Sequence, residues 1–188
     1  MKNLRTFAIA LFTIGTLAVS AQNKKINVEK STVKWVGKKV TGQHTGTVGL
    51  QDGSLVFKKD KLAGGAFTVN MNSIQVTDLQ PGQGKEKLEG HLKNDDFFGT
   101  DKYPTATLNF KTIAAKKNNI YTVTADLTIK GKTAPVVFDL AVAGNSATTT
   151  FQVDRTKYDV KYGSGSFFSN LGDKTIDDNF EISATLVW

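Results

Sequence analysis

The sequence predicts an all-β domain that closes into an antiparallel barrel and carries one short helical insert. Three observations predict it. From Thr32 onward apolar residues alternate with polar ones, as in half-buried strands; helical periodicity is nearly missing; and turn-forming pairs separate the alternating runs. Eight or nine such strands can stack as two sheets or curl into a barrel, and closure alone removes the exposed sheet edges. We therefore expect the barrel.

The N-terminus predicts a signal peptide over residues 1–21. Lys2 and Arg5 precede an uncharged run over residues 6–19, and small residues follow up to Ala21. This run is shorter than the roughly 20 residues that a membrane-spanning helix needs. We expect cleavage near Ala21, one barrel domain over residues 22–188, and a periplasmic or secreted location.

Composition narrows the class of partner. The chain has no cysteine, so we expect stability without disulfides and no lipid anchor on a cysteine. The formal charge is a modest +7, and the lysines fall in pairs mostly where turns are expected. Solvated turns explain these pairs, with transient contact with a membrane surface as the alternative. We expect no nucleic acid partner, and the sequence leaves the oligomeric state open, a dimer included.

The clearest predicted strand alternates Tyr121, Val123, Ala125, Leu127 and Ile129 with polar residues. The same alternation predicts strands around these apolar residues: Val33 and Trp35; Val48 and Leu50; Leu55 and Phe57; Phe67, Val69 and Met71; Ala106, Leu108 and Phe110; Val136, Phe138, Leu140 and Val142; Phe151 and Val153; Phe180, Ile182, Ala184, Leu186 and Trp188. Chain-reversing turns are predicted at Asp52-Gly53, Asn118-Asn119, Gly131-Lys132 and Gly144-Asn145.

Two segments depart from the strand pattern. Residues 84–95 place Leu88 and Leu92 four apart among polar residues, which predicts a short amphipathic helix that could cover one end of the barrel. Residues 162–172 combine glycines with Phe167 and Phe168, which predicts a loop that caps the barrel or forms part of its mouth.

No set of residues predicts catalysis or a metal site. The chain has two histidines, His44 and His91, and no cysteine, so a zinc site would need carboxylates at no recognisable spacing. The adjacent acids at 95–96 and 177–178 do not face each other on a strand or a helix. No serine lies in a Gly-x-Ser-x-Gly elbow. We expect a protein that is not an enzyme and requires no cofactor.

Three stretches carry a resemblance to a known family. The first has His-Leu at 91–92, Asp-Phe-Phe at 96–98 and Tyr-Pro at 103–104; the second is DLTIKGKTAPV at 126–136; the third is DRTKYDV at 154–160. Together they resemble the YceI-like family of polyisoprenoid-binding proteins, over roughly residues 26–187, which is nearly all of the expected mature chain. The resemblance implies an extended, eight-stranded, lipocalin-like barrel in the periplasm, with a polyisoprenoid or isoprenoid quinone in its tunnel. Ala134 stands where many members have a basic residue, so a charge interaction at that position is in doubt.

If a prenyl tail fills the tunnel, its lining comes from the aromatic and branched members of the apolar stripes. We predict these lining residues: Val33, Trp35, Phe67, Val69, Leu108, Phe110, Val123, Leu127, Phe138, Leu140, Phe151 and Ile182. From their positions, Phe167, Phe168 and Tyr158 are predicted to gate the mouth, and Arg155 or Lys157 to meet a polar head group. The expected function is storage, transport or protection of the lipid.

Three other functions remain to be separated from this one. A secreted barrel with a filled core would have a structural or stress role and no guest. A small outer-membrane barrel is suggested by the aromatic Trp188 at the end of the last strand, but several apolar stripes are shorter than the 9–11 residues of a membrane strand, and the sequence shows no paired aromatic girdles. An enzyme acting on a lipid would need a nucleophile with a partnered base, which the sequence does not offer.

Overall fold

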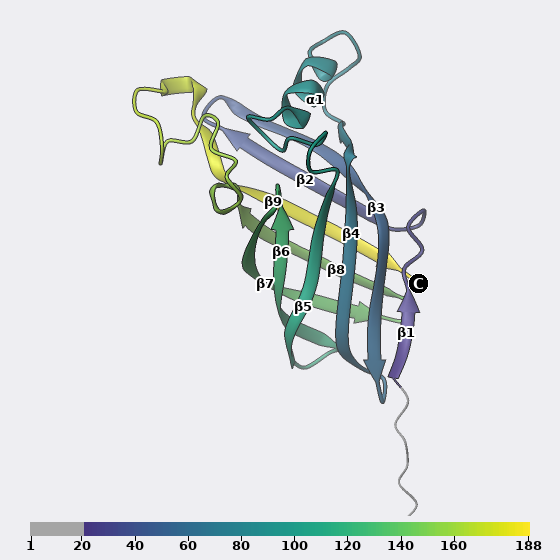
Figure 1. Ribbon diagram of the computed structural model, residues 1–188. Coiled ribbons are helices and arrows are strands. Elements are labelled where there is room, and N and C mark those ends of the chain that lie inside the picture. Colours follow the sequence, from purple (N-terminus) through teal and green to yellow (C-terminus); the bar gives the residue numbers. More distant parts are fainter. Residues whose placement is uncertain (1–20) are drawn as a thin grey trace, which may run out of the picture.

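The computed structural model describes residues 21–188 as one closed barrel (Figure 1). The predicted signal peptide lies outside the described residues, apart from Ala21. The elements are β1 (Ala21–Lys25), β2 (Thr32–Lys39), β3 (Gly42–Lys58), β4 (Lys61–Val76), α1 (Lys85–Lys93), β5 (Thr105–Ala115), β6 (Ile120–Ile129), β7 (Lys132–Ala143), β8 (Ser146–Asp154), the 3₁₀ turns η1 (Arg155–Tyr158) and η2 (Gly172–Lys174), and β9 (Ile176–Val187).

Eight strands form the closed ring, in the order β3, β2, β9, β8, β7, β6, β5 and β4, and the pairing of β4 with β3 completes it. Every pairing between these strands is antiparallel. The predicted all-β, eight-stranded antiparallel, lipocalin-like barrel is confirmed. Because the ring is closed, each of the eight strands pairs with a neighbour on both sides along at least part of its length. No strand is a fully unpaired edge, and such edges are the usual route to edge-to-edge aggregation.

The alternation of the sequence becomes the two faces of the barrel wall. In β6, Tyr121, Val123 and Ala125 are buried inside, whereas the intervening threonines and Asp126 lie on the outer face. In β7, Ala134, Val136, Phe138 and Leu140 repeat the pattern. Successive side chains of a strand point to opposite faces, so an unbroken period of two fixes which residues are inside.

Tight hairpins connect most neighbouring strands. Asn118 and Asn119 join β5 to β6 with positive φ at both residues, and Lys130 and Gly131 do the same between β6 and β7. Positive φ at both central residues matches the twist of the flanking strands. Gly144, also at positive φ, joins β7 to β8. The turns predicted at these three places are confirmed.

The turn predicted at Asp52-Gly53 is wrong. Both residues lie inside β3, a single strand that contains the two runs assigned to separate strands. The pairing with β4 shifts register between Leu50 and Asp52, which marks a bulge. Gly53 faces inward, where a Cβ would lie 2.6 Å from Cδ1 of Phe67, so the glycine makes room for that ring. The chain reverses instead at Lys59 and Asp60, both with positive φ.

β1 was not predicted, because its sequence AQNKK has no apolar alternation. It pairs with residues 54–58 in the second half of β3, while β2 pairs with residues 42–48 in the first half. β1 therefore continues along β3 where β2 ends. Ile26, just after β1, is 3% exposed and belongs to the core.

The two ends of the barrel differ, and they are named here by what they carry. The α1 end carries α1, the turns at 40–41 and 130–131, and residues 159–175 between η1 and β9 (Figure 1). The hairpin end carries the tight turns at 59–60, 118–119 and 144–145, together with the start of β1 and the C-terminal Trp188. The predicted helix over 84–95 is confirmed as α1, with Leu92 buried against the barrel and Leu88 packed beside it.

The core consists of two clusters. The first fills the barrel toward the hairpin end with fully buried side chains such as Leu55, Val123 and Ala147. The second lies toward the α1 end and includes Ile74, Leu92, Phe97 and Tyr158. Ala134, where many family members have a basic residue, is 9% exposed within this second, apolar cluster.

Candidate ligand cavity

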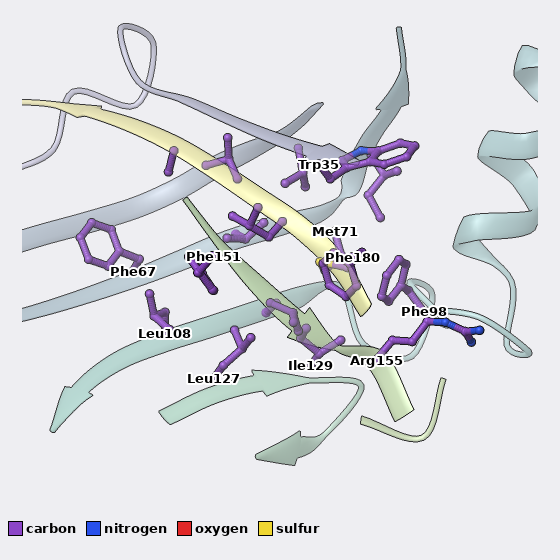
Figure 2. Close-up of a pocket in the computed structure, with 18 of the residues that line it drawn as sticks. Trp35, Phe67, Met71, Phe98, Leu108, Leu127, Ile129, Phe151, Arg155 and Phe180 are labelled. Carbon is purple, nitrogen blue, oxygen red and sulfur yellow. The ribbon is translucent and has the colours of Figure 1, made fainter. Parts of the chain in front are cut away.

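A cavity of about 190 Å³, measured as space open to the centres of water molecules, lies inside the barrel. All eight strands of the closed ring contribute to its wall, together with Leu92 of α1 and the adjacent Phe97 and Phe98. Figure 2 shows aromatic, aliphatic and Met side chains from opposite sides of the barrel turned toward this space. Apart from glycine, the wall departs from apolar character only at Thr149, Arg155 and Asp177.

The structure places eleven of the twelve predicted lining residues in the cavity wall: Val33, Trp35, Phe67, Val69, Leu108, Phe110, Leu127, Phe138, Leu140, Phe151 and Ile182. Val123 does not line the cavity. It lies near the start of β6 with 0% exposure, opposite Phe138 and Ile113 in the strand register, and belongs to the filled part of the core. An inward-facing residue lines the cavity only where no other side chain occupies the space in front of it.

Several inward-facing apolar residues are only half-buried although the barrel is closed. Val69, Leu108, Leu127 and Ile182 all line the cavity and all retain part of their accessible surface. In a filled core such residues lose nearly all of it, because protein interiors pack as densely as organic crystals. The surface they retain faces the cavity, so the middle of the barrel is hollow.

Sequence reasoning missed the wall nearest the α1 end. Phe97 and Phe98 lie in the loop after α1, and Phe180 lies near the start of β9. The signal was present, since 96–98 is the Asp-Phe-Phe of the first family-like stretch, but a loop has no alternation from which to read an inward face. Ile74 was missed because the inward positions of β4 change parity between Met71 and Ile74, and Leu92 was missed because it lies on the helix.

Aromatic rings pack against one another in the cavity wall at the α1 end. Phe98 packs edge to face on Phe180, with ring centroids 6.3 Å apart, and on Phe97 at 5.2 Å. Figure 2 shows Phe98 and Phe180 beside Met71 and Arg155 at this end of the cavity. Phe180 is paired in register with Gly37 of β2, which has no side chain to compete for the space. Phe98 and Phe180 both line the cavity, and both keep part of their surface exposed.

Arg155 lines the cavity but its charged group is already bound. Its guanidinium donates to the carbonyl oxygens of Val160, Tyr162, Ile176 and Asp177 at 2.8–3.0 Å, and lies 3.6 Å from the carboxylate of Asp178. Burial lowers the pKa of Arg155, and the nearby aspartates oppose that effect. A guanidinium has five N–H donors, four of which are used by these carbonyls. Arg155 therefore fastens residues 160–177 to the barrel and has little left for a head group.

The other four predicted mouth residues do not line the cavity. Tyr158 is 1% exposed within the core, and its hydroxyl has no hydrogen-bond partner in the described residues. Lys157 is exposed on η1. Phe167 and Phe168 are about half exposed, at 51% and 50%, on the loop between η1 and β9. They lie at the α1 end and face solvent.

Neither histidine forms part of a catalytic arrangement. His44 pairs with Asp78 at 2.9 Å near the start of β3. Burial raises the pKa of Asp78, but the hydrogen bonds with Thr45 and His44 outweigh it and lower that pKa. His91 packs its ring on Tyr162 and Phe97. Within residues 21–188, no three His, Asp or Glu side chains gather in a way that could hold a metal ion. No helix in this part of the chain is long and apolar enough to cross a membrane.

A known family matches most of the chain. The family model of the YceI-like domain matches residues 25–188. The chain belongs to the YceI-like family. The resemblance drawn from the three sequence stretches is thereby confirmed.

Curated relatives of this YceI-like chain include the protein YceI of Shigella flexneri, 31% identical over 145 residues that cover 74% of this chain and 70% of that one. A UPF0312 protein of Shewanella denitrificans is 32% identical over 93 residues, which cover 50% of this chain and 46% of the relative. The chain thus spans about half the length of some of the relatives that it matches.

Solved structures share the barrel. BcnA of Burkholderia cenocepacia superposes with a TM-score of 0.67 at 26% identity, covering 87% of this chain and 99% of BcnA. A polyisoprenoid-binding domain from Saccharophagus degradans, implicated in plant cell wall breakdown, gives 0.59 at 13% identity, covering 90% and 97% of the two chains. At 13% identity the second likeness is one of fold.

The three stretches that carry the family resemblance meet at the α1 end of this YceI-like barrel. The first spans the end of α1 and the loop to β5, the second is the β6–β7 hairpin, and the third is η1 with its flanks. Lys130 joins them, since its ammonium donates to the carbonyl oxygens of Asp95 at 2.6 Å and Asp159 at 3.4 Å. The family-like residues therefore build the part of the cavity wall at the α1 end, including Phe97, Phe98 and Leu127.

Proposed function

We propose that this protein encloses one apolar isoprenoid lipid, a polyisoprenoid or an isoprenoid quinone, in the barrel cavity for storage, transport or protection. The YceI-like barrel supports a binding protein. The observation that carries the proposal is the half-buried apolar wall: residues such as Leu108 and Ile182 face a space that no side chain of the protein fills. The polyisoprenoid-binding domain of similar fold adds support.

The volume of the cavity limits the size of the guest that can bind without a change of conformation. An engineered apolar cavity of about 150 Å³ stays dry and takes up benzene. At about 190 Å³, the cavity has room for a guest larger than one aromatic ring, such as a short stretch of prenyl chain. A longer tail would extend through the α1 end, which requires Phe98 and Phe180 to part. These two rings are the gate of the proposed site.

Apolar burial supplies the affinity. Each methylene-equivalent removed from water contributes about 0.8 kcal/mol, so each isoprene unit contributes several kcal/mol before the entropy of ordering the chain is subtracted. One methylene more or less changes the affinity by only about 1–3 kcal/mol. Because the wall has few polar groups, we expect the protein to accept tails of different length and to read the head group loosely.

The same proposal places the protein outside the cytoplasm, in the periplasm or secreted, on the strength of the N-terminal signal pattern. It also assigns binding rather than catalysis, since the cavity contains no nucleophile with a partnered base. An inserted outer-membrane barrel needs an apolar outer band. Here the outward side chains of β6 are Ile120, three threonines and Asp126, so most of them are polar, which favours a barrel surrounded by water.

The test is extraction of lipid from the native protein. Protein expressed from the full sequence and purified without detergent is extracted with organic solvent, and the extract is analysed by mass spectrometry. We expect a prenyl lipid near one equivalent per chain, and uptake of a fluorescent prenyl analogue after delipidation. Recovery of no lipid together with no uptake would instead support the filled-core alternative. A guest without isoprene units would retain the binding role and overturn the lipid class.

A further inference from the structure

The exposed apolar side chains gather at one end of the barrel. Among the described residues, six large apolar side chains are more than a third exposed, and four of these are Val40, Tyr162, Phe167 and Phe168. These four residues, called here the aromatic patch, lie on the β2–β3 turn and on the loop between η1 and β9, both at the α1 end (Figure 1). The two segments touch, because the amide of Val40 donates to the carbonyl oxygen of Thr175.

The turns at the opposite, hairpin end of the barrel carry no such group of exposed apolar side chains. The hairpin-end turns at 59–60, 118–119 and 144–145 consist of lysine, aspartate, asparagine and glycine, and none presents an exposed large apolar side chain. Val137, 62% exposed, lies alone on the outer wall of β7. Single exposed apolar residues need no explanation, but a group of them at one place marks an interaction site.

The loop holds Phe167 and Phe168 outward in a fixed turn. Both amides donate to the carbonyl oxygen of Ser164, which is 0% exposed. Ser166 donates its hydroxyl to Asp178 at 2.5 Å, and Arg155 binds the two ends of the loop. The rings therefore face solvent on a loop that several hydrogen bonds hold in place.

The two segments that carry the aromatic patch are rich in lysine. Residues 38–42 and 157–175 contain five lysines and two aspartates. Lys161 lies over the ring of Phe167, 5.0 Å from its centroid, and pairs with Asp159 at 2.8 Å. Aromatic residues flanked by lysines are typical of the boundary between water and lipid, where rings enter the head-group layer and ammonium groups meet anionic lipids.

We propose that the α1 end docks onto a lipid bilayer through the aromatic patch, with the lysines of the same two segments against anionic head groups. A second copy of the chain is a poorer occupant. Four side chains of this size, about half exposed, offer on the order of 400 Å², below the roughly 800 Å² a side of a stable protein interface. A bilayer needs no such area, because inserted rings contribute one by one.

Docking at this end also fits the position of the cavity. Ile176 and Asp177, directly after the loop, line the cavity, and the gate residue Phe180 follows in the same strand. If the cavity holds a prenyl lipid, as proposed above, docking brings the gate to the membrane, and the tail can exchange without crossing water. The docking itself does not depend on what the cavity holds.

The test is flotation of the purified protein with vesicles of phosphatidylethanolamine and phosphatidylglycerol. We expect the wild-type protein to float with the vesicles. Phe167→Ser with Phe168→Ser should lower the partition coefficient at least about tenfold. Val137→Ser, which removes an exposed apolar residue from the barrel wall, is the matched control and should bind as the wild type does. Circular dichroism establishes that each variant is folded.

Two further variants separate insertion from a merely structural role. Phe168→Trp should keep the affinity and shift its added fluorescence to shorter wavelength on binding vesicles, with quenching by brominated lipid. Lys38→Gln with Lys39→Gln should weaken binding to the anionic vesicles, whereas Lys58→Gln with Lys61→Gln at the hairpin end should not. Both lysine pairs are exposed and near a turn, but they lie at opposite ends of the barrel.

Three results would overturn the proposal: wild-type protein that does not float, equal loss of binding in Val137→Ser, or a patch variant that changes only the oligomeric state of the protein. The last would identify the patch as a contact between copies. The outcome is separate from that of the lipid extraction, because protein with an empty cavity can still bind vesicles and lipid-loaded protein can fail to bind them.

Discussion

The indole of Trp35 lies across the bare backbone of Gly46, its partner in the β2–β3 register. A Cβ on Gly46 would overlap the Trp35 ring on one side and the carbonyl oxygen of Gln75 on the other. The indole N–H donates to the carbonyl oxygen of Thr47, which holds the ring in this place. Trp35 lines the cavity, so the absence of a side chain at Gly46 sets the shape of the cavity wall.

Gly46→Ala is therefore expected to destabilise the barrel. Because backbone as well as the indole blocks the new methyl group, we expect a loss of about 2–4 kcal/mol in the free energy of unfolding. Urea unfolding measures it, as a lower midpoint with an unchanged slope. Gly64→Ala in β4 is the control, since its Cβ would meet Val56 at an ordinary 3.4 Å. Equal effects of the two substitutions would mean that Trp35 does not occupy this position.

Arg155 provides a second expectation. Arg155→Met leaves four carbonyl groups without their donor, and we expect a loss of about 3–5 kcal/mol in the free energy of unfolding. Amide hydrogen exchange should rise throughout residues 160–177, which the guanidinium fastens. Lys157→Met, an exposed position two residues away, should change stability by less than about 0.5 kcal/mol. A stable Arg155→Met protein with altered head-group preference would restore the head-group role predicted from the sequence.

The residues of the cavity wall could be predicted from the sequence, whereas the role of Arg155 could not. An inward or outward position follows from alternation alone, so eleven lining residues could be chosen from single strands. The hydrogen-bond partners of Arg155 come from residues 160, 162, 176 and 177, brought together only by the closed barrel. In the same way, whether Val123 lines the cavity or lies in the filled core depends on which side chains face it. The alternation of the sequence does not contain that information.

The missed turn at Asp52-Gly53 has a different cause. Asp-Gly is a strong hairpin signal by local preference. Here Gly53 leaves room for the ring of Phe67, and the bulge at Leu50 allows β3 to continue beyond Gly53. The actual turn at Lys59 and Asp60 has neither glycine nor asparagine. Tertiary contacts with β4 decided the conformation in both places, and a reading of local residues cannot include them.

Tyr158 leads to an expectation about alkaline pH. Burial, and secondarily the charge of Asp154, raises the pKa of Tyr158 to about 12, above its ordinary value of 10.0. The folded state therefore holds the proton more tightly than the unfolded state. The stability that this provides is complete below pH 10 and is lost as pH rises from 10 to 12. Its upper limit is about 2–3 kcal/mol.

Tyr158→Phe should remove this part of the pH dependence. At neutral pH we expect stability equal to or slightly above that of the wild type, because the buried hydroxyl has no hydrogen-bond partner to lose. Urea unfolding at a series of pH values between 9 and 12 measures the difference between variant and wild type. Tyr162→Phe, at a 46% exposed position, is the control. A strongly destabilised Tyr158→Phe protein at neutral pH would mean that the hydroxyl does have a partner.

The hollow wall itself can be tested by filling it. Ala184 of β9 lines the cavity between Val33 and Thr149 of the neighbouring strands. A cavity of about 150 Å³ accommodates a benzene molecule, so the ring of Ala184→Phe would take up much of the 190 Å³ available here. We expect this variant to bind a fluorescent prenyl analogue at least about tenfold more weakly, because several methylene-equivalents of the guest lose their place.

Stability should separate filling from damage. A ring that enters empty apolar space gains packing, so the free energy of unfolding of Ala184→Phe should stay within about 1 kcal/mol of the wild type. Thr185→Phe places the same ring on the outer face one residue along and should leave uptake unchanged. Undiminished uptake by a stable Ala184→Phe protein would show that the guest binds elsewhere, whereas a large loss of stability would show that the space in front of Ala184 is already filled by the protein's own side chains.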